Sequence, residues 1–401
     1  MSTEQGPAAA ANTLRRFALP LLVLSAFTLR LLVVLLLPDQ SAQLPDAIAY
    51  RHAAEHLKQS LQLGTPVFMP LYPLLLTFTG GGVGQLLLDV TLSTLLVYLI
   101  HQLAMTLFRD VRVALLAALI AAIYPHFIFF AAVGLTETLF MTLTVAAYLC
   151  WYRRLFAWAA VLIVLSILTR PAIELLVPVL VLWFAVGVHR LSLRVAARKL
   201  AALGTIYVAL MSPWWLHNYM AYGSFVRLNL GAGLALYSGN NPWHRGGGGD
   251  FNVDAHAAAV ASTDDPVLRD RLLREAAVAH IFSDPREFLA QAGRKFLRFW
   301  RLWPFTETYS SLPYVLASGL SFGSVLTLSI FYLVGWGFRD FRQTASILLL
   351  IGYLTAVHMI VPASLRYRLP LEPFLIVLAA GGLVRLGEQL SRRGQTTCLA
   401  E

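Results

Sequence analysis

The sequence has 401 residues, of which 58% are apolar and only 13% are charged, and it carries a formal net charge of +10. Soluble domains average about half apolar and about a quarter charged residues, so this composition excludes a soluble globular domain and indicates a protein embedded in lipid. The arginines stand in short clusters at the ends of apolar runs, which is typical of membrane topology rather than of a nucleic-acid-binding surface. The two cysteines, Cys150 and Cys398, are too few for a disulfide framework.

Ten apolar runs are each predicted to cross a membrane as a helix, since about 20 mostly apolar residues span about 30 Å of hydrocarbon. The first run follows Arg15 and Arg16 and has no small-residue cleavage site after it, so it is predicted to be retained rather than removed as a signal peptide. The sequence therefore predicts an all-α polytopic membrane protein whose single domain covers residues 1–401. The ten predicted spans are Phe17–Leu37, Gln85–Phe108, Val113–Ala131, Leu135–Tyr152, Leu155–Leu168, Pro171–Val188, Leu200–Leu216, Tyr314–Phe338, Gln343–Val361 and Leu371–Leu386.

Basic clusters give these spans an orientation. If the amino terminus is cytoplasmic, every cluster falls on the cytoplasmic side of the plasma or inner membrane, which is the positive-inside pattern. Both termini are then cytoplasmic, and two long segments, at about residues 38–84 and 217–313, lie outside, where chemistry is expected. The clusters are Arg15/Arg16, Arg109/Arg112, Arg153/Arg154, Arg190/Arg194/Arg198/Lys199, Arg339/Arg342 and Arg392/Arg393.

Ionisable residues near the membrane gather at the outer face. A charge in hydrocarbon costs at least about 2.5 to 3.5 kcal/mol, so such residues are expected to have a function or a partner. Only Arg30 and His101 lie near the midplane, whereas a transporter would carry charges across the bilayer centre; the distribution favours an interfacial active site. The alternative for each residue is that its polar end simply reaches water. The outer residues are Asp46, Asp89, His126, Glu137, Arg170, Glu174, His358, Arg366 and Arg368.

The larger outer segment divides into two parts. Residues 223–251 are rich in glycine, asparagine and proline and are predicted to form a mobile loop, which either closes over substrates or only connects its neighbours. Asp265 and Asp284 are each followed by proline, which predicts the starts of two short helices. The second of these carries an apolar stripe opposite basic residues, which favours an amphipathic helix at the membrane interface or against an external core. Its basic residues are Arg294, Lys295, Arg298 and Arg301.

Seven short motifs follow one another along the chain. They are Asp46 with Tyr50, Ala54 and Leu57; Pro70-Leu71-Tyr72-Pro73; Leu135-Thr136-Glu137-Thr138-Leu139-Phe140; Thr169-Arg170-Pro171; Pro213-Trp214-Trp215 with Asn218-Tyr219; Gly233 to Pro242, ending Gly239-Asn240-Asn241-Pro242; and Arg366-Tyr367-Arg368-Leu369-Pro370. Together they resemble the GT-C fold glycosyltransferases that use polyprenyl-phosphate sugars, in particular the protein O-mannosyltransferase and lipid A aminoarabinose transferase group, glycosyltransferase family 39. The resemblance covers most of the chain and implies a GT-C-like bundle and transfer with inversion. The chain departs from many relatives at Ala47, where they carry a second acid.

Asp46 and Glu137 are the candidate catalytic acids. The acceptor must lose a proton as it attacks the anomeric carbon, and Asp46 in the first outer loop is the predicted general base. The alternative is that Asp46, which follows Pro45, caps a helix, and the two roles are compatible. Glu137 is expected to orient Arg170, to hold the acceptor, or to help Asp46 position a cation. Carboxylates suit Mg²⁺ or Mn²⁺, but no metal is assigned and no cofactor is predicted with certainty.

Arginines are predicted to bind the donor phosphate, because the planar guanidinium pairs with phosphate oxygens bidentately. Arg366 and Arg368, between the last two spans, are the first candidates and Arg170 is the next; simple contact with interfacial water is the alternative for each. His126 and His358 lie near the same face, where a lone histidine at a helix end is more often structural. The further substrate-site candidates are Tyr50, Tyr72, His126, Asn240, Asn241 and His358.

The sequence thus predicts a membrane glycosyltransferase that moves a sugar from a polyprenyl-phosphate donor to a lipid, glycan or protein acceptor at the outer face. The small outer segment favours a lipid or glycan acceptor. Membrane lipids are expected partners, and nucleic acid is not. A carrier or flippase for lipid-linked sugars would need the same arginines but no general base, and a scaffold would need neither. Asp46 discriminates between these functions, because only the enzyme requires it.

Overall fold

The structure, a computed structural model, describes residues 7–36, 44–80, 82–243, 257, 260–304 and 311–398. All regular secondary structure in these ranges is helical. Seven of the helices described are long and apolar enough to cross a membrane. The predicted all-α polytopic membrane fold is therefore confirmed.

Helices occupy all ten of the predicted spans. Seven correspond to the long apolar helices: α1 (Pro7–Leu36), α4 (Gly82–Phe108), α9 (Val177–Leu182) with its flanking turns, α10 (Leu193–Tyr222), α15 (Leu312–Tyr332), α16 (Phe341–Ile360) and α18 (Glu372–Cys398). The other three are α5 (Val111–Ile123), α7 (Glu137–Tyr152) and α8 (Phe156–Thr169), with 13, 16 and 14 residues. These three fall short of the roughly 20 residues that a perpendicular span needs.

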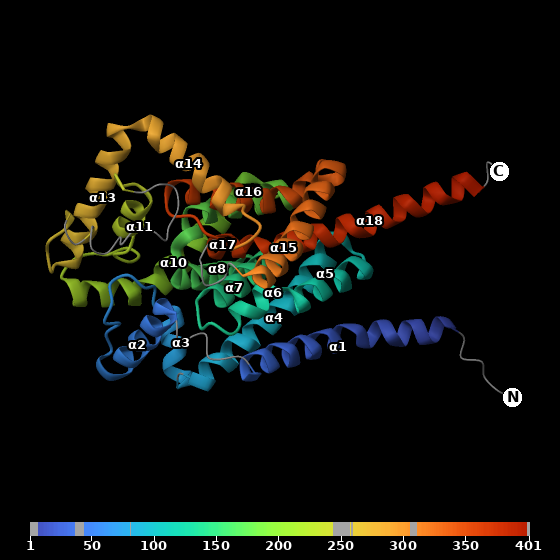
Figure 1. Cartoon of the computed structure of the whole chain (residues 1–401), viewed down its shortest axis with the longest axis horizontal. Coiled ribbons are helices and arrows are strands. Elements are labelled where there is room, and N and C mark those ends of the chain that lie inside the picture. Colours follow the sequence, from blue (N-terminus) through green and yellow to red (C-terminus); the bar gives the residue numbers. More distant parts are fainter. Residues whose placement is uncertain are drawn as a thin grey trace.

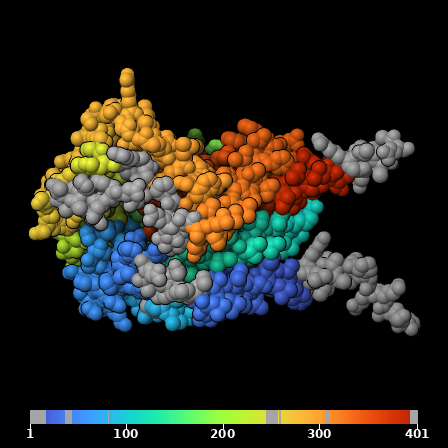
Figure 2. Space-filling view, in the orientation of Figure 1, coloured from blue at the N-terminus to red at the C-terminus, as the bar shows by residue number. Residues whose placement is uncertain are grey.

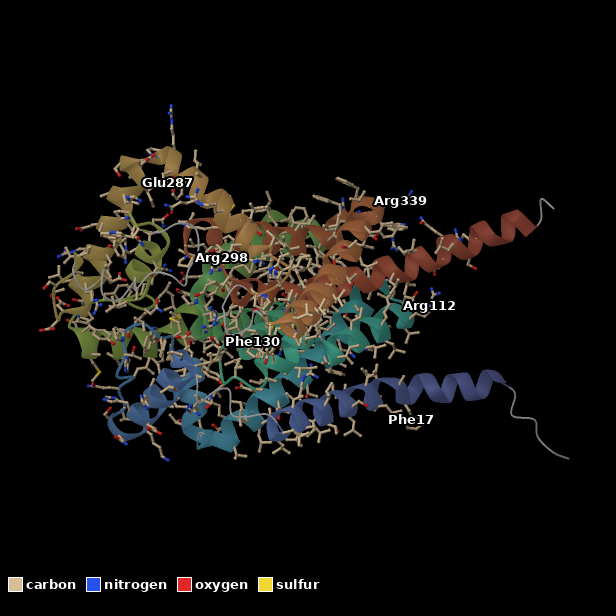
Figure 3. All side chains as sticks on the ribbon, in the orientation of Figure 1. Phe17, Arg112, Phe130, Glu287, Arg298 and Arg339 are labelled. Atoms are coloured by element: carbon tan, nitrogen blue, oxygen red, sulfur yellow. The ribbon has the colours of Figure 1, made fainter. Side chains whose placement is uncertain are left out.

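Five further helices gather at one end of the molecule, opposite to both chain termini (Figure 1). They are α2 (Pro45–Ser60), α3 (Leu71–Thr79), α11 (Ala232–Gly239), α13 (Pro266–Ser283) and α14 (Pro285–Phe299). In the space-filling view, α13 and α14 in yellow and orange and α2 in blue form the upper and lower parts of this end (Figure 2). Arg112 and Arg339 lie toward the other end, with the termini, while Glu287 lies among the five helices (Figure 3). Which membrane side each end faces stays a prediction.

Helix α18 lies at the centre of the bundle, where its residues from Phe374 to Ala380 are buried against α15, α5 and α4. Close packing with α15 depends on Gly382, because a methyl group there would lie 2.7 Å from the Leu328 carbonyl oxygen. The hydroxyl of Ser329 donates to the Leu375 carbonyl at 2.7 Å across the same contact. The segment that precedes α18, and that carries Arg366, is thus attached to a buried helix of the bundle.

Arg30, which the sequence placed near the midplane, fastens the otherwise peripheral helix α1 to the bundle. Its guanidinium is fully buried and donates to the Ser93 hydroxyl at 2.7 Å and to the carbonyls of Ala121 and Ala122 at 3.0 Å. Those carbonyls belong to the last turn of α5, where a cation is favoured by the helix dipole. Arg30 therefore has a structural partner set rather than a place in a transport path.

The predicted span Val113–Ala131 is wrong in one respect, because the helix breaks near its end. Helix α5 ends at Ile123, Tyr124 has extended backbone, and the short α6 (Pro125–Phe130) begins at the proline. Proline removes a donor and disfavours helical backbone in the residue before it. The break turns His126 into the interior of the bundle.

The predicted loop at residues 223–251 is also wrong in part, since α11 lies within it. Tyr237 of α11 is buried against Leu273 and Ala277 of α13, forming a small second hydrophobic cluster. This tertiary burial outweighs the glycine-rich composition of the segment. Residues 244–251 of the predicted loop lie outside the described ranges.

The two helices predicted after Asp265 and Asp284 are confirmed as α13 and α14, and each aspartate accepts a cap hydrogen bond, from Val267 N at 2.9 Å and Glu287 N at 3.0 Å. The predicted basic face of α14 is wrong for Lys295, because that side chain is buried. Leu289 and Phe296 of the predicted apolar stripe are exposed, as a helix at the membrane interface allows.

Candidate active site

Four charged residues from four separate elements form a continuous chain of ion pairs. Arg366 on α17 (Leu365–Arg368) binds Asp46 at the start of α2 through Nη1 and Glu137 at the start of α7 through Nε. Arg170, the residue that ends α8, binds the same Oε1 atom of Glu137. Asp46, Arg366, Glu137 and Arg170, called the ion-pair chain below, therefore balance two negative charges with two positive charges.

Glu137 is the one buried member of the ion-pair chain. The side chains of Asp46, Arg366 and Arg170 are 51%, 25% and 19% exposed, whereas that of Glu137 is 1% exposed. A fully buried charge is retained only where it is paired, so Glu137 is the anchor of the group. The other three are the members that a molecule from solvent can reach.

Asp46 does not cap its helix. The N-cap of α2 is Leu44, which makes no side-chain cap bond, and Asp46 stands within the first turn, where the helix dipole favours a negative charge. Its carboxylate is held by Arg366 instead. The capping alternative is therefore wrong, and the aspartate is directed toward the other charged residues.

Aromatic residues of α2, of α3 and of the segment between them pack beside the ion-pair chain. Tyr50 stacks on Phe68 with ring centroids 4.1 Å apart and meets Tyr72 edge to face at 5.5 Å. Tyr72 is fully buried and donates to Asp89 Oδ2 at 2.8 Å, while Gln85 donates to the Tyr72 hydroxyl at 3.2 Å. Burial raises the pKa of Tyr50, so this phenol stays protonated. Tyr72 packs against Tyr50 and is not accessible to a substrate.

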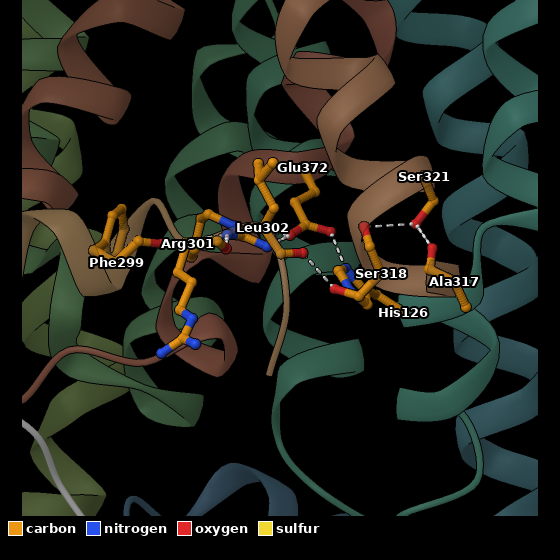
Figure 4. A network of polar contacts seen from close by, with 9 residues as sticks. His126, Phe299, Arg301, Leu302, Ala317, Ser318, Ser321 and Glu372 are labelled. Atoms are coloured by element: carbon orange, nitrogen blue, oxygen red, sulfur yellow. Dashed lines mark hydrogen bonds and ion pairs between the residues drawn. The ribbon is translucent and has the colours of Figure 1, made fainter. Parts of the chain in front are cut away.

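A second buried group, called the Glu372 network below, joins His126 on α6 to Glu372 on α18 and Ser318 on α15 (Figure 4). His126 Nδ1 lies 2.8 Å from Glu372 Oε2, and Nε2 lies 2.9 Å from the Ser318 hydroxyl. Ser318 donates its one hydrogen to the Leu302 carbonyl at 2.7 Å, so His126 must donate from Nε2. The orientation of the imidazole is thus fixed by its partners.

Arg368 belongs to the Glu372 network and not to the ion-pair chain. It is fully buried, donates from Nε to Glu372 Oε1 at 3.0 Å, and lies 3.3 Å from the centroid of the Phe322 ring. It also donates to the carbonyls of Phe299, the last residue of α14, and of Arg301. Residues two apart on a helix point to different sides. Arg366 and Arg368 therefore have different ion-pair partners.

Three other predicted substrate-site residues build the junction between α11, α16 and α14. Asn240 donates to the Ile360 carbonyl at 2.8 Å, and Asn241 donates to the Tyr237 carbonyl at 2.8 Å. The His358 ring is stacked on Tyr367, with centroids 4.8 Å apart. These contacts are with backbone carbonyls and with Tyr367, and they do not involve a member of the ion-pair chain.

Glu372 and Lys295 are buried charged residues that the sequence reasoning missed as site candidates. Glu372 could have been found, because it follows Arg368 by four positions, the spacing at which opposite charges pair on a helix. Lys295 carried no such signal, since its partners are an amide and a carbonyl far away in the sequence. Within the described ranges no group of three histidine, cysteine, aspartate or glutamate side chains forms a metal site.

Two solved structures share this architecture, both of an oligosaccharyltransferase from Archaeoglobus fulgidus. The archaeal oligosaccharyltransferase AglB in complex with an inhibitory peptide and a dolichol-phosphate matches with a TM-score of 0.55 and 14% identity, over 96% of this chain and 52% of that one. The apo form of the enzyme matches with a TM-score of 0.54 and 13% identity, over 95% and 52%. This chain has the GT-C fold. No protein-family model and no curated protein matches the sequence.

The match covers nearly all of this chain but only about half of the length of the two oligosaccharyltransferases. The shared GT-C fold establishes how the helices are arranged, and identities of 13 to 14% carry no residue roles across. The chemistry must be argued from the ion-pair chain itself.

Proposed function

We propose that this GT-C protein is a membrane glycosyltransferase that moves a sugar from a polyprenyl-phosphate donor to a lipid, glycan or protein acceptor at the outer face of the cell membrane. The observation that carries the proposal is the contact between Asp46 and Arg366. It brings a partly exposed carboxylate and a partly exposed guanidinium to one point. Transfer from a sugar phosphate needs these two groups, a base for the acceptor and a cation for the leaving phosphate.

Arg366 and Arg170 are the groups that we assign to the donor phosphate. Both are partly exposed and both are held by the buried Glu137, which leaves other guanidinium donors of each free to pair with phosphate oxygens. Archaeoglobus AglB, the structural neighbour, is described with a dolichol-phosphate, a lipid phosphate of the class proposed here. Arg368 supports the segment that carries Arg366 and is not assigned a phosphate contact.

Asp46 is the proposed general base. The acceptor oxygen or nitrogen attacks the anomeric carbon and forms the new glycosidic bond, while the bond from that carbon to the phosphate oxygen breaks with its electron pair. The polyprenyl phosphate leaves as an anion beside Arg366, and the acceptor proton passes to the Asp46 carboxylate. Attack opposite to the leaving phosphate inverts the anomeric centre.

Donor binding also changes the state of Asp46. Asp46 accepts from Arg366 Nη1, so a phosphate that pairs with the same guanidinium competes with the carboxylate. A carboxylate released in this way can accept the proton of the acceptor. The pairing therefore links occupancy of the donor site to release of the base.

Glu137 is assigned a positioning role. It is buried and accepts from both arginines, so it has no free approach to a substrate, and it fixes the spacing of the two cations. This favours the first of the roles considered for it, orientation of Arg170, and extends that role to Arg366.

The proposal is tested by offering purified protein in nanodiscs a panel of polyprenyl-phosphate sugars, with envelope lipids, glycans and peptides as acceptors. Radiolabelled sugar should appear in one acceptor class only when the donor is present. Donor binding without product across the whole panel, together with movement of the donor between leaflets of a vesicle, would instead establish the carrier.

A further inference from the structure

A buried lysine lies at the junction between two helices, α11 and α14, called the outer helices below, and the segment that carries Arg366. Lys295 faces inward from α14, with a relative exposure of 1%. Its Nζ donates to Asn240 Oδ1 at 3.1 Å and to the Ile360 carbonyl at 2.8 Å. No carboxylate of the described residues forms an ion pair with it, and a buried charge without a counter-ion is costly. Burial lowers the pKa of Lys295 to about 8.

Three helices meet at the Ile360 carbonyl. It ends α16 and accepts from Lys295 of α14 and from Asn240, the residue that follows α11. The approach of α11 is close, because a methyl group on Gly239 would lie 3.1 Å from the same oxygen. Only five residues separate Ile360 from Arg366, so this junction is where the outer helices hold the arginine segment.

A stack of rings runs from the same face of α14 toward the ion-pair chain. The ring of His358 lies between Phe299, one turn after Lys295, and Tyr367, with centroids 5.4 and 4.8 Å apart and planes inclined by 16° and 8°. The guanidinium of Arg170 lies 5.5 Å from the Tyr367 centroid. A displacement of α14 would therefore disturb both ends of the 360–368 segment, Ile360 through Lys295 and Tyr367 through His358.

We propose that Lys295 is a positioning residue that holds the 360–368 segment against α11 and α14, so that Arg366 meets the donor phosphate only while these outer helices are docked. The inference rests on the proposed function for the role of Arg366. Lys295 itself touches neither substrate in this account. A cation serves better than a neutral side chain, because it can donate to the amide and the carbonyl together.

The test compares Lys295→Met, which keeps the length of the side chain without the amine, with Arg294→Met, which removes the neighbouring cation. Arg294 is exposed and pairs with Glu287, so Arg294→Met is the matched control. In Lys295→Met we expect hydrogen exchange of the 360–368 segment to quicken and the donor KM to rise about tenfold or more, with a much smaller change in kcat. In Arg294→Met, hydrogen exchange of the 360–368 segment and the donor KM should stay at wild-type values.

A second variant keeps the test decisive if Lys295→Met does not fold. Gly239→Ala presses on the Ile360 carbonyl from the α11 side with the lysine intact, and it should quicken exchange in the same segment. Wild-type exchange and an unchanged donor KM in the variants would overturn the inference. Because exchange is measured without turnover, faster exchange in a protein that never transfers sugar would support the junction and refute the proposed function.

Discussion

Among single residues, Glu137 binds both arginines of the ion-pair chain while almost fully buried. Glu137→Gln leaves Arg366 and Arg170 close together without their shared anion. Removing one partner of a buried ion pair costs about 3 to 5 kcal/mol, so we expect a clearly lower midpoint of thermal unfolding and weaker donor binding. Both are measurable in detergent, with Glu174→Gln as the control, since that glutamate pairs with Arg227 and not with the ion-pair chain. Equal stability of Glu137→Gln and wild type would contradict the anchoring role.

Lys295 gives a prediction about pH. Its pKa is about 8 in the folded protein and 10.5 in an exposed lysine, so between these values the unfolded chain binds more protons than the folded one. The free energy of unfolding should then rise with pH, by up to about 1.4 kcal/mol per pH unit from this group. The rise is complete above the unfolded pKa and is lost as the pH falls through 8. Unfolding measured from pH 7.5 to 10 should show a smaller rise in Lys295→Met; identical slopes would refute the prediction.

The residues of the ion-pair chain could be chosen from the sequence, because charges at span ends are few and four of them stand in family-like motifs. The sequence does not predict which of these residues pair with one another. Arg366 and Arg368 look equivalent in the string Arg366-Tyr367-Arg368. Because a short helix points their side chains in different directions, Arg366 pairs with Asp46 and Arg368 pairs with Glu372. The burial of Lys295 depends on Asn240 and Ile360, which are 55 and 65 positions away.

At the scale of elements, we expect the buried Arg30 to hold the peripheral helix α1 against the bundle. Only 11% of the apolar window of α1 is buried, and Arg30 provides its bonds to Ser93, Ala121 and Ala122. Arg30→Leu removes charge-assisted hydrogen bonds, and we expect a loss of about 1 to 3 kcal/mol in the free energy of unfolding. Arg30→Lys should recover part of it, because a lysine cannot reach all the acceptors at once. An unchanged unfolding midpoint in Arg30→Leu would show that α1 is held by lipid and packing alone.

Hydropathy predicted where helices lie and missed where they break. The proline at position 125 was visible, but the apolar run continues through it, so the sequence suggested one span where the structure has α5 and α6. Helix α11 was missed for the opposite reason. Its segment is rich in turn-forming residues, and it is helical because Tyr237 finds a buried place against α13, a long-range contact that local propensity does not contain.

For the whole molecule, the two ends should face opposite sides of the membrane. Single cysteines at Ser283, the last residue of α13, and at Ser192, before α10, would be placed in a background lacking Cys150 and Cys398; both positions are exposed. With the charge pattern setting orientation, a membrane-impermeant maleimide added to intact cells should label Ser283→Cys and spare Ser192→Cys until the cells are opened. Labelling of Ser192→Cys alone would reverse the orientation and move the candidate site to the cytoplasm.

The general-base role of Asp46 is tested most directly by measuring donor binding and donor discharge on the same nanodisc samples of wild type and Asp46→Asn. Asp265→Asn is the control, because asparagine caps a helix as well as aspartate does. The account predicts that Asp46→Asn still binds the polyprenyl-phosphate sugar, while its discharge falls about 10²- to 10⁴-fold, and that Asp265→Asn behaves as wild type. Discharge by Asp46→Asn at the wild-type rate would contradict it.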